Sequence, residues 1–187
     1  IFTTLLPTKE TDDLLDNWVM QNEQLKYKAD RIVTNYYKLL DKNPSAYDKY
    51  MARVSSVFLE SFLFYSGFYY PLYLAGNGRM TTSGEIIRKI LLDESIHGVF
   101  TGLDAQEMKG ELTAEEQERA DKEMYVLLND LYENEVIYTK SLYDKLGLSD
   151  DVLNYLQYNA NKALANLGFD PYFEEKGFNP IIENALD

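Results

Sequence analysis

The 187-residue chain is 45% hydrophobic and 26% charged, which is ordinary for a folded globular protein and excludes an intrinsically disordered one. Its net charge of −13 argues against a nucleic-acid partner, because phosphate binding depends on Lys and Arg. The chain has no cysteine, which excludes disulfides and fits the reducing cytoplasm, and no run near the ~18 apolar residues that would span a membrane.

The two ends of the sequence predict a piece of a longer protein. The first residue is Ile1 rather than Met, and the residues after it lack the basic flank and cleavage site of a secretory signal. The other end stops at Asp187 without an evident cap. We therefore expect further residues on both sides.

The first part of the chain has the apolar periodicity of helices, with prolines near their ends. We expect helices over about residues 9–21, 24–42 and 47–73, the third of them long and aromatic. A turn should follow at Gly76, Asn77 and Gly78, because Gly and Asn tolerate the positive φ angles that other residues avoid.

The second part contains two pairs with the spacing of a capping box, in which a Ser or Thr and an acid three residues later satisfy the first helical amides. These pairs are Thr82 with Glu85 and Thr113 with Glu116, and Ser149 is a third predicted cap. The helices that follow should cover about residues 82–108, 113–146 and 149–167. No stretch alternates with period two, so the prediction is a single all-α domain over residues 1–187.

Glu60 lies within an aromatic stretch. At 3.6 residues per turn, Val57, Glu60, Phe64 and Phe68 share one helix face, which is predicted to point inward. A buried carboxylate is costly unless it is protonated or bound to a cation. The alternative is an ordinary Glu that pairs with Lys or Arg or lies on the solvated face.

A Glu-x-x-His pair lies in the next predicted helix. Glu94 and His97 are three residues apart, so their side chains leave one face with Cβ atoms about 5–6 Å apart. Such a pair can supply a carboxylate and an imidazole to a metal. By itself the pattern is weak, and a structural histidine is the alternative.

A lone inward Glu together with an inward Glu-x-x-His is more specific. Ferritin-like dimetal proteins use a Glu from each of two helices and a Glu-x-x-His from each of two others. His97 is the only histidine in the sequence, so a second Glu-x-x-His is impossible within it. The residues therefore predict half of a dimetal site.

The sequence resembles the small subunit of class Ib ribonucleotide reductase over essentially its whole length. The resemblance rests on residues 58–62 (FLESF), 66–68 (SGF), 84–88 (GEIIR), 93–98 (DESIHG) and 158–168 (YNANKALANLG). It implies a partial ferritin-like helical bundle that corresponds to the C-terminal part of that subunit.

The resemblance implies a dinuclear manganese or iron centre. Glu60, Glu94 and His97 would be ligands of one metal, with Glu94 able to bridge to the other, and hard Mn and Fe ions suit such ligands. Asp93 would join a metal-bound histidine of the missing half to a tryptophan on the radical-transfer route. The alternative for Asp93 is a solvated helix acid.

The resemblance also implies two groups of residues around the centre. Residues that would form the apolar lining near the radical, or simply core, are Phe64, Phe68 and Ile90. Residues that would form the channel for an oxidant from a flavodoxin-like activator are Ser61, Tyr65, Lys162 and Asn166. Without the family, Lys162 and Asn166 would be read as ordinary surface residues.

The implied activity is that of the radical-generating subunit of ribonucleoside-diphosphate reductase. It would be a homodimer whose tyrosyl radical passes to the large (alpha) subunit. The first-half ligands and the radical tyrosine should precede Ile1, and the tail that docks on the large subunit should follow Asp187. The alternatives are an inactive helical fragment or assembly piece, and a related ferritin-like oxidase or metal store.

Overall fold

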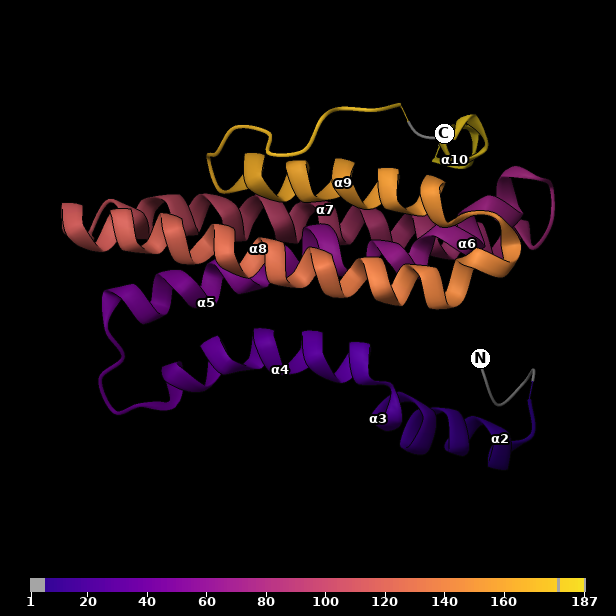
Figure 1. The fold of residues 1–187 in the computed structure, drawn as a ribbon, viewed down its shortest axis with the longest axis horizontal. Coiled ribbons are helices and arrows are strands. Elements are labelled where there is room, and N and C mark those ends of the chain that lie inside the picture. Colours follow the sequence, from indigo (N-terminus) through magenta and orange to yellow (C-terminus); the bar gives the residue numbers. More distant parts are fainter. Residues whose placement is uncertain (1–5, 178, 187) are drawn as a thin grey trace.

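The computed structural model describes residues 6–177 and 179–186. All regular structure in these residues is helical, so the predicted all-α class is confirmed (Figure 1). Within this part of the chain, no helix is both long enough and apolar enough to cross a bilayer.

The chain starts with a layer of short helices and one longer helix. α2 (Thr8–Asp12) continues through the π-helical turn η1 (Asp13–Trp18) into α3 (Val19–Gln21). α4 (Glu23–Tyr37) begins after Asn22, whose side chain accepts a hydrogen bond from the Leu25 amide at 2.9 Å, and ends in the 3₁₀ turn η2 (Lys38–Leu40). The helices predicted over residues 9–21 and 24–42 are therefore present, and the second is shorter than expected.

The aromatic helix predicted over residues 47–73 is interrupted. α5 (Ala46–Phe58) starts at a capping box of Ser45 and Asp48, and the π-helical turn η3 (Leu59–Leu63) separates it from α6 (Tyr65–Gly76). A π turn inserts one extra residue into a helix, and such turns are frequent at functional sites.

Long helices make up the second part. α7 (Thr81–Lys109) leads to α8 (Ala114–Tyr143), where the predicted capping box of Thr113 and Glu116 is confirmed by reciprocal hydrogen bonds. The 3₁₀ turn η4 (Asp144–Leu146), α9 (Ser149–Asn166) and α10 (Pro180–Leu186) follow.

The other two predicted caps are wrong. α7 already begins at Thr81, and its cap residue is Met80 with φ 48°, so Thr82 lies inside the first turn and cannot cap it. Ser149 is the first residue of α9 after the cap residue Leu148, and its hydroxyl donates to Asp144. A capping residue must have an extended backbone just before the first turn, which spacing alone does not reveal. The short helix α10 was not predicted.

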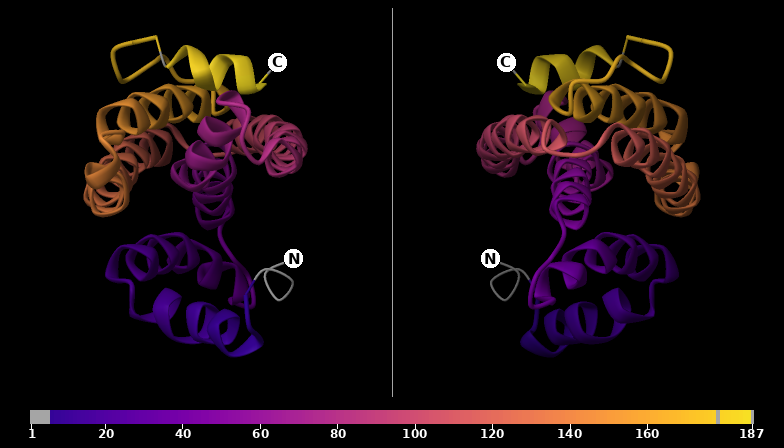
Figure 2. Two further views of the ribbon diagram at one scale, coloured as in Figure 1. Left: turned by 90° about the vertical axis from the view of Figure 1, so that its right-hand side faces the viewer. Right: turned by 90° about the vertical axis from the view of Figure 1, so that its left-hand side faces the viewer.

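The helices form layers around α5 and α6 (Figure 2). Seen along the long axis, α7 lies on one side of α5 and α6, and α8 with α9 lies on the other. α4 packs against α5 and α8, and α10 lies across α6. The turn η3 contacts both α7 and α9, so the middle of the aromatic helix lies at the centre of the bundle.

The side of α7 that packs on the bundle includes several small residues, namely Gly84, Gly98, Gly102 and Ala105. Gly102 lies so close to α9 that a Cβ there would overlap the main-chain oxygen of Asn166. We expect Gly102→Ala to lower the free energy of unfolding by about 1–3 kcal/mol, because main chain rather than a flexible side chain must move. The control is Gly67→Ala in α6, where nothing lies within 4 Å of the added carbon. It should raise stability by up to about 1 kcal/mol. Urea unfolding measures both, and equal effects of the two substitutions would contradict the predicted close contact.

The core is rich in tyrosine. The ring of Tyr155 lies 5.8 Å from that of Tyr65 and 5.7 Å from that of Tyr69. Burial raises the pKa of Tyr47 and of Tyr65 to about 12. Burial also raises the pKa of Tyr50, Tyr69, Tyr143 and Tyr155.

The raised pKa values of these tyrosines predict that the protein loses stability at alkaline pH. A tyrosine whose pKa is higher in the folded than in the unfolded state stabilises the fold fully below about pH 10, and this contribution is lost as the pH rises through its folded pKa. We expect the free energy of unfolding to fall between about pH 10 and pH 12, as measured by urea titration. Tyr65→Phe removes one of these groups and should make the fall shallower; an unchanged slope would contradict the role of Tyr65.

Candidate metal centre

The turn η3 carries Glu60 toward α7. Ser61, Phe62 and Leu63 are buried in this turn, whereas the Glu60 side chain keeps 26% of its surface exposed. Gly98 allows the close approach of α7, because a Cβ at this position would meet the side chains of Ser61 and Asn166. The π turn and the glycine together bring one carboxylate within reach of the next helix.

Glu94 and His97 meet Glu60 at this point. His97 Nδ1 lies 3.3 Å from Glu94 Oε2 and 3.6 Å from Glu60 Oε2. Ligand atoms of all three side chains lie within 4.8 Å of one another. The structure therefore brings together the three residues that the sequence predicted as metal ligands.

The electrostatics of the cluster favour a bound cation. Burial, followed by the nearby Glu94 carboxylate, raises the pKa of Glu60 to about 7, although His97 opposes this shift. The hydrogen bond to Glu94 is the largest cause that raises the pKa of His97. Two carboxylates held this close repel each other when both are ionised, and a divalent cation between them removes that cost.

The donor set fits manganese or iron. Two carboxylates and a neutral imidazole are ligands that these ions accept. Metal–ligand bonds of about 2.0–2.2 Å need donor atoms about 3–4 Å apart, so small side-chain rotations would bring the three groups onto one ion. Three protein donors leave positions of a six-coordinate ion to be filled from elsewhere.

The predicted inward orientation is only partly correct. The Glu94 side chain is 16% exposed, but that of His97 is 58% exposed. The reason is that this face of α7 is not covered by another described helix, since neighbouring apolar side chains on it are exposed too. They are Leu92, Ile96, Val99, Phe100 and Leu103.

The residues predicted for radical transfer and for the apolar lining differ in their exposure and surroundings. Asp93 is exposed on α7. Phe64 and Phe68 are half-buried with ring centroids 6.1 Å apart, and Ile90 on α7 is also half-buried. Phe64 lines an apolar groove of about 470 Å³ together with residues of α4 and η3.

Three of the four residues predicted for the oxidant channel take part in two hydrogen bonds beside the cluster. Asn166 donates to the Ser61 hydroxyl at 3.2 Å, and Lys162 donates to Ser95, the neighbour of Glu94, at 3.5 Å. Tyr65 is buried, and its ring is 5.7 Å from that of Phe68. These residues of α9, η3 and α6 thus lie next to Glu60 and Glu94.

The chain as a whole is similar to known proteins. Residues 1–180 match the family described as "Ribonucleotide reductase, small chain". The chain belongs to this family. It is 53% identical over 187 residues to ribonucleoside-diphosphate reductase subunit beta of Bacillus subtilis (strain 168), covering 100% of this chain and 56% of that protein. It is 46% identical over 191 residues to subunit beta nrdF1 of Mycobacterium tuberculosis (strain ATCC 25618 / H37Rv), with coverages of 100% and 56%.

Solved structures of ribonucleotide reductase small chains have the same fold. Dimanganese(II)-NrdF of Streptococcus sanguinis superposes with a TM-score of 0.89 at 44% identity, covering 100% of this chain and 64% of that one. The R2 subunit of Clostridium botulinum superposes with a TM-score of 0.76 at 26% identity, covering 94% and 56%. The predicted family and ferritin-like bundle are confirmed. The chain spans 56% of the length of the B. subtilis subunit, so it matches only part of its relatives.

One buried ion pair of this small-chain bundle was missed. Lys28 of α4 and Glu135 of α8 meet 2.8 Å apart, and the Glu135 side chain is completely buried. In the sequence both residues resemble solvated helix charges. The signal was the spacing of Glu135 with Leu128, Leu131 and Tyr138, which places it on the buried face of α8.

Proposed function

We propose that this chain is part of the radical-generating subunit of a ribonucleoside-diphosphate reductase. The observation that carries the proposal is the meeting of Glu60, Glu94 and His97 in a chain of the small-chain family. The 0.89 TM-score to a dimanganese protein supports a dinuclear manganese centre over a generic metal store, and iron accepts the same ligands.

Glu60, Glu94 and His97 would hold one metal of the centre, and Glu94 would bridge to a second. When bound, the metal pair supplies the one-electron oxidation of a tyrosine. With His97 as the only histidine, a second Glu-x-x-His pair has to come from outside these 187 residues. His97 Nδ1 faces the carboxylates of Glu94 and Glu60, so it is the ring nitrogen that would bind the metal.

The surroundings support a centre that is closed off from water in the complete protein. The exposed apolar face of α7 lies beside His97, and soluble proteins rarely leave such faces uncovered. Phe64, Phe68 and Ile90 would add apolar walls around the metal centre. Such walls keep a stored tyrosyl radical from reacting with water.

Two further roles belong to the same proposal. The exposed carboxylate of Asp93, next to Glu94, would hydrogen-bond to a ligand of the missing half and pass the radical toward the large (alpha) subunit of a cytoplasmic enzyme. Ser61, Tyr65, Lys162 and Asn166 would line the route by which a flavodoxin-like activator delivers an oxidant. The complete subunit would be a homodimer.

The test uses the complete subunit that contains this chain, with activator and large subunit. We expect Mn or Fe in stoichiometric amounts by metal analysis, a tyrosyl radical by electron paramagnetic resonance, and reduction of ribonucleoside diphosphates. Anomalous scattering at the Mn and Fe edges would identify the metal beside Glu60. A protein without Mn or Fe would overturn the proposal and favour an inactive assembly piece. Full activity after Glu60→Ala would overturn the proposed metal centre at Glu60.

A further inference from the structure

The π turn that carries Glu60 leaves one main-chain carbonyl without its usual helical partner. In an α-helix the Gly67 amide would donate to the Leu63 carbonyl. Instead, the amides of Gly67 and Phe68 both donate to the Phe64 carbonyl, at 3.1 and 3.3 Å. The Leu63 oxygen therefore needs a donor from another part of the structure, because an unpaired buried carbonyl is costly.

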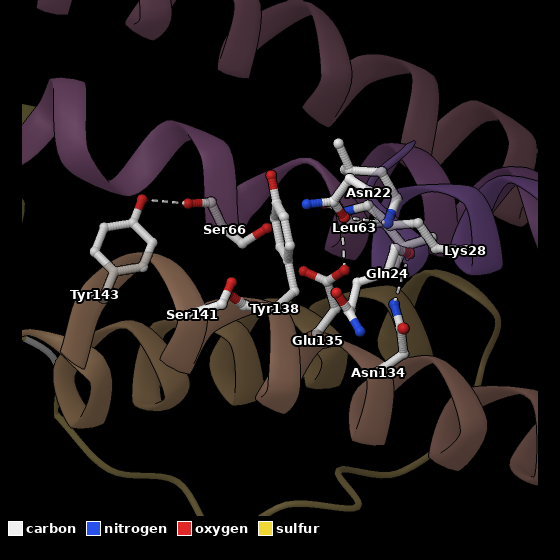
Figure 3. A network of polar contacts seen from close by, with 11 residues as sticks. Asn22, Gln24, Lys28, Leu63, Ser66, Asn134, Glu135, Tyr138, Ser141 and Tyr143 are labelled. Atoms are coloured by element: carbon white, nitrogen blue, oxygen red, sulfur yellow. Dashed lines mark hydrogen bonds and ion pairs between the residues drawn. The ribbon is translucent and has the colours of Figure 1, made fainter. Parts of the chain in front are cut away.

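Lys28 supplies that donor (Figure 3). Its Nζ lies 3.4 Å from the Leu63 oxygen and 2.8 Å from Glu135 Oε1, and it lies 4.7 Å from the centre of the Tyr138 ring. The Lys28 side chain is 15% exposed and that of Glu135 is 0% exposed. One ammonium group thus links α4, α8 and the end of the π turn.

The geometry of this contact favours a positioning role over a stabilising one. A buried ion pair gains little net stability, because desolvation of both charges offsets their attraction, but it does favour one arrangement of its partners. Arg31 and Asp130 join the same two helices at 2.6 Å, yet their side chains are 33% and 39% exposed and neither bonds to the turn. Of these two ion pairs, it is the Lys28 pair that contacts the segment that carries Glu60.

The location of the extra residue in the turn determines where Glu60 points. One inserted residue rotates the following helix by about 100° relative to the preceding one. Other polar contacts hold the same segment from α8 and α9: Tyr143 donates to the Ser66 carbonyl at 2.6 Å, and Asn166 donates to the Ser61 hydroxyl at 3.2 Å. Lys28 contacts the same segment from α4, through the Leu63 carbonyl.

We propose that Lys28 and Glu135 are positioning residues for the metal centre, which hold the Leu63 carbonyl so that the π turn presents Glu60 to Glu94 and His97. This inference rests on the proposed function only for the metal; the hold on the turn is independent of it. Lys28 and Glu135 contact neither Glu94 nor His97, so their effect passes through the main chain of η3.

The test compares variants of the complete subunit in two measurements. Lys28→Met with Glu135→Met removes both charges and keeps an apolar contact, and Arg31→Met with Asp130→Asn is the matched control. Hydrogen exchange of the metal-free protein reports on the amides of residues 59–66, and Mn(II) titration followed by electron paramagnetic resonance reports on affinity. We expect faster exchange and about 10-fold weaker Mn(II) binding in the first variant, in the range seen when outer partners of ligands are removed. The control should leave both unchanged.

The outcomes separate this inference from the proposed function. If the unchanged protein binds no Mn(II), the proposed function fails, and the exchange rates still decide whether the pair holds the turn. If the unchanged protein binds Mn(II) and the Lys28 and Glu135 variant matches it in both measurements, the inference is overturned. An equal effect of the control would also overturn it. If the double variant fails to fold, Glu135→Gln replaces it, because this substitution keeps the shape of the side chain. Glu135→Gln should also speed exchange and weaken Mn(II) binding. If it changes neither the exchange rates nor the Mn(II) affinity, the inference is overturned.

Discussion

Glu94→Ala is expected to weaken Mn(II) binding by the complete subunit by more than about 100-fold, beyond the range seen for residues that only support a ligand. Glu94 is the residue that connects the cluster. It hydrogen-bonds to His97 at 3.3 Å, and its carboxylate also lies close enough to Glu60 to raise the pKa of that residue. The substitution therefore removes a ligand and also releases the orientation of the imidazole.

Titration with Mn(II) under anaerobic conditions measures this loss, and the tyrosyl radical signal after activation should disappear with it. Glu107→Ala is the matched control, because Glu107 is an exposed glutamate on the same helix α7 and is far along it from the cluster. Binding by the Glu94→Ala protein within a few-fold of the unchanged protein would show that the cluster is not the metal site.

Lys28→Met alone is expected to lower the free energy of unfolding by about 3–5 kcal/mol, because it leaves the Glu135 carboxylate buried and unpaired. The Glu135 side chain has no exposed surface, and its Oε2 atom already has no hydrogen-bond partner among the described residues. Adding Glu135→Met should restore most of the loss, since the remaining contact is apolar.

Urea unfolding of the unsubstituted protein, of Lys28→Met and of the double variant tests this expectation. Arg31→Met should cost less than about 1 kcal/mol, because the partly exposed Arg31 and Asp130 are screened by solvent. If Lys28→Met and Arg31→Met had similar effects, Glu135 would have to reach water or another partner in solution. Comparison of Lys28→Met with the double variant separates two contributions to the free energy of unfolding: the cost of a buried unpaired charge, and the net stabilisation by the ion pair.

Local patterns in the sequence predicted the features that depend on neighbouring residues. The three-residue spacing of Glu94 and His97 places both on one helix face in any helix, and the spacing of Thr113 and Glu116 correctly predicted the start of α8. The same reasoning failed for Thr82 and Ser149, because preceding residues had already started those helices. A cap depends on backbone conformation as well as on residue type.

The argument that placed Glu60 on an inward helix face was incomplete. The argument assumed an unbroken α-helix from Val57 to Phe68, but the turn η3 inserts a residue between them. Nothing in the residues 59–63 by themselves requires a π turn. It depends on contacts with Lys28, Tyr143 and Asn166, which lie 35, 77 and 105 residues from their partners.

The sequence by itself determined the helical class, the limit of one Glu-x-x-His pair and, through the family resemblance, the predicted ligand set of Glu60, Glu94 and His97, because these follow from short-range spacing, from counting and from motifs that can be compared one by one. Only the tertiary structure decided that the three side chains meet, that His97 lies on an exposed face and that Lys28 and Glu135 hold the intervening turn. These features depend on residues that are distant in the chain and become neighbours only when the helices pack, so no local pattern contains them.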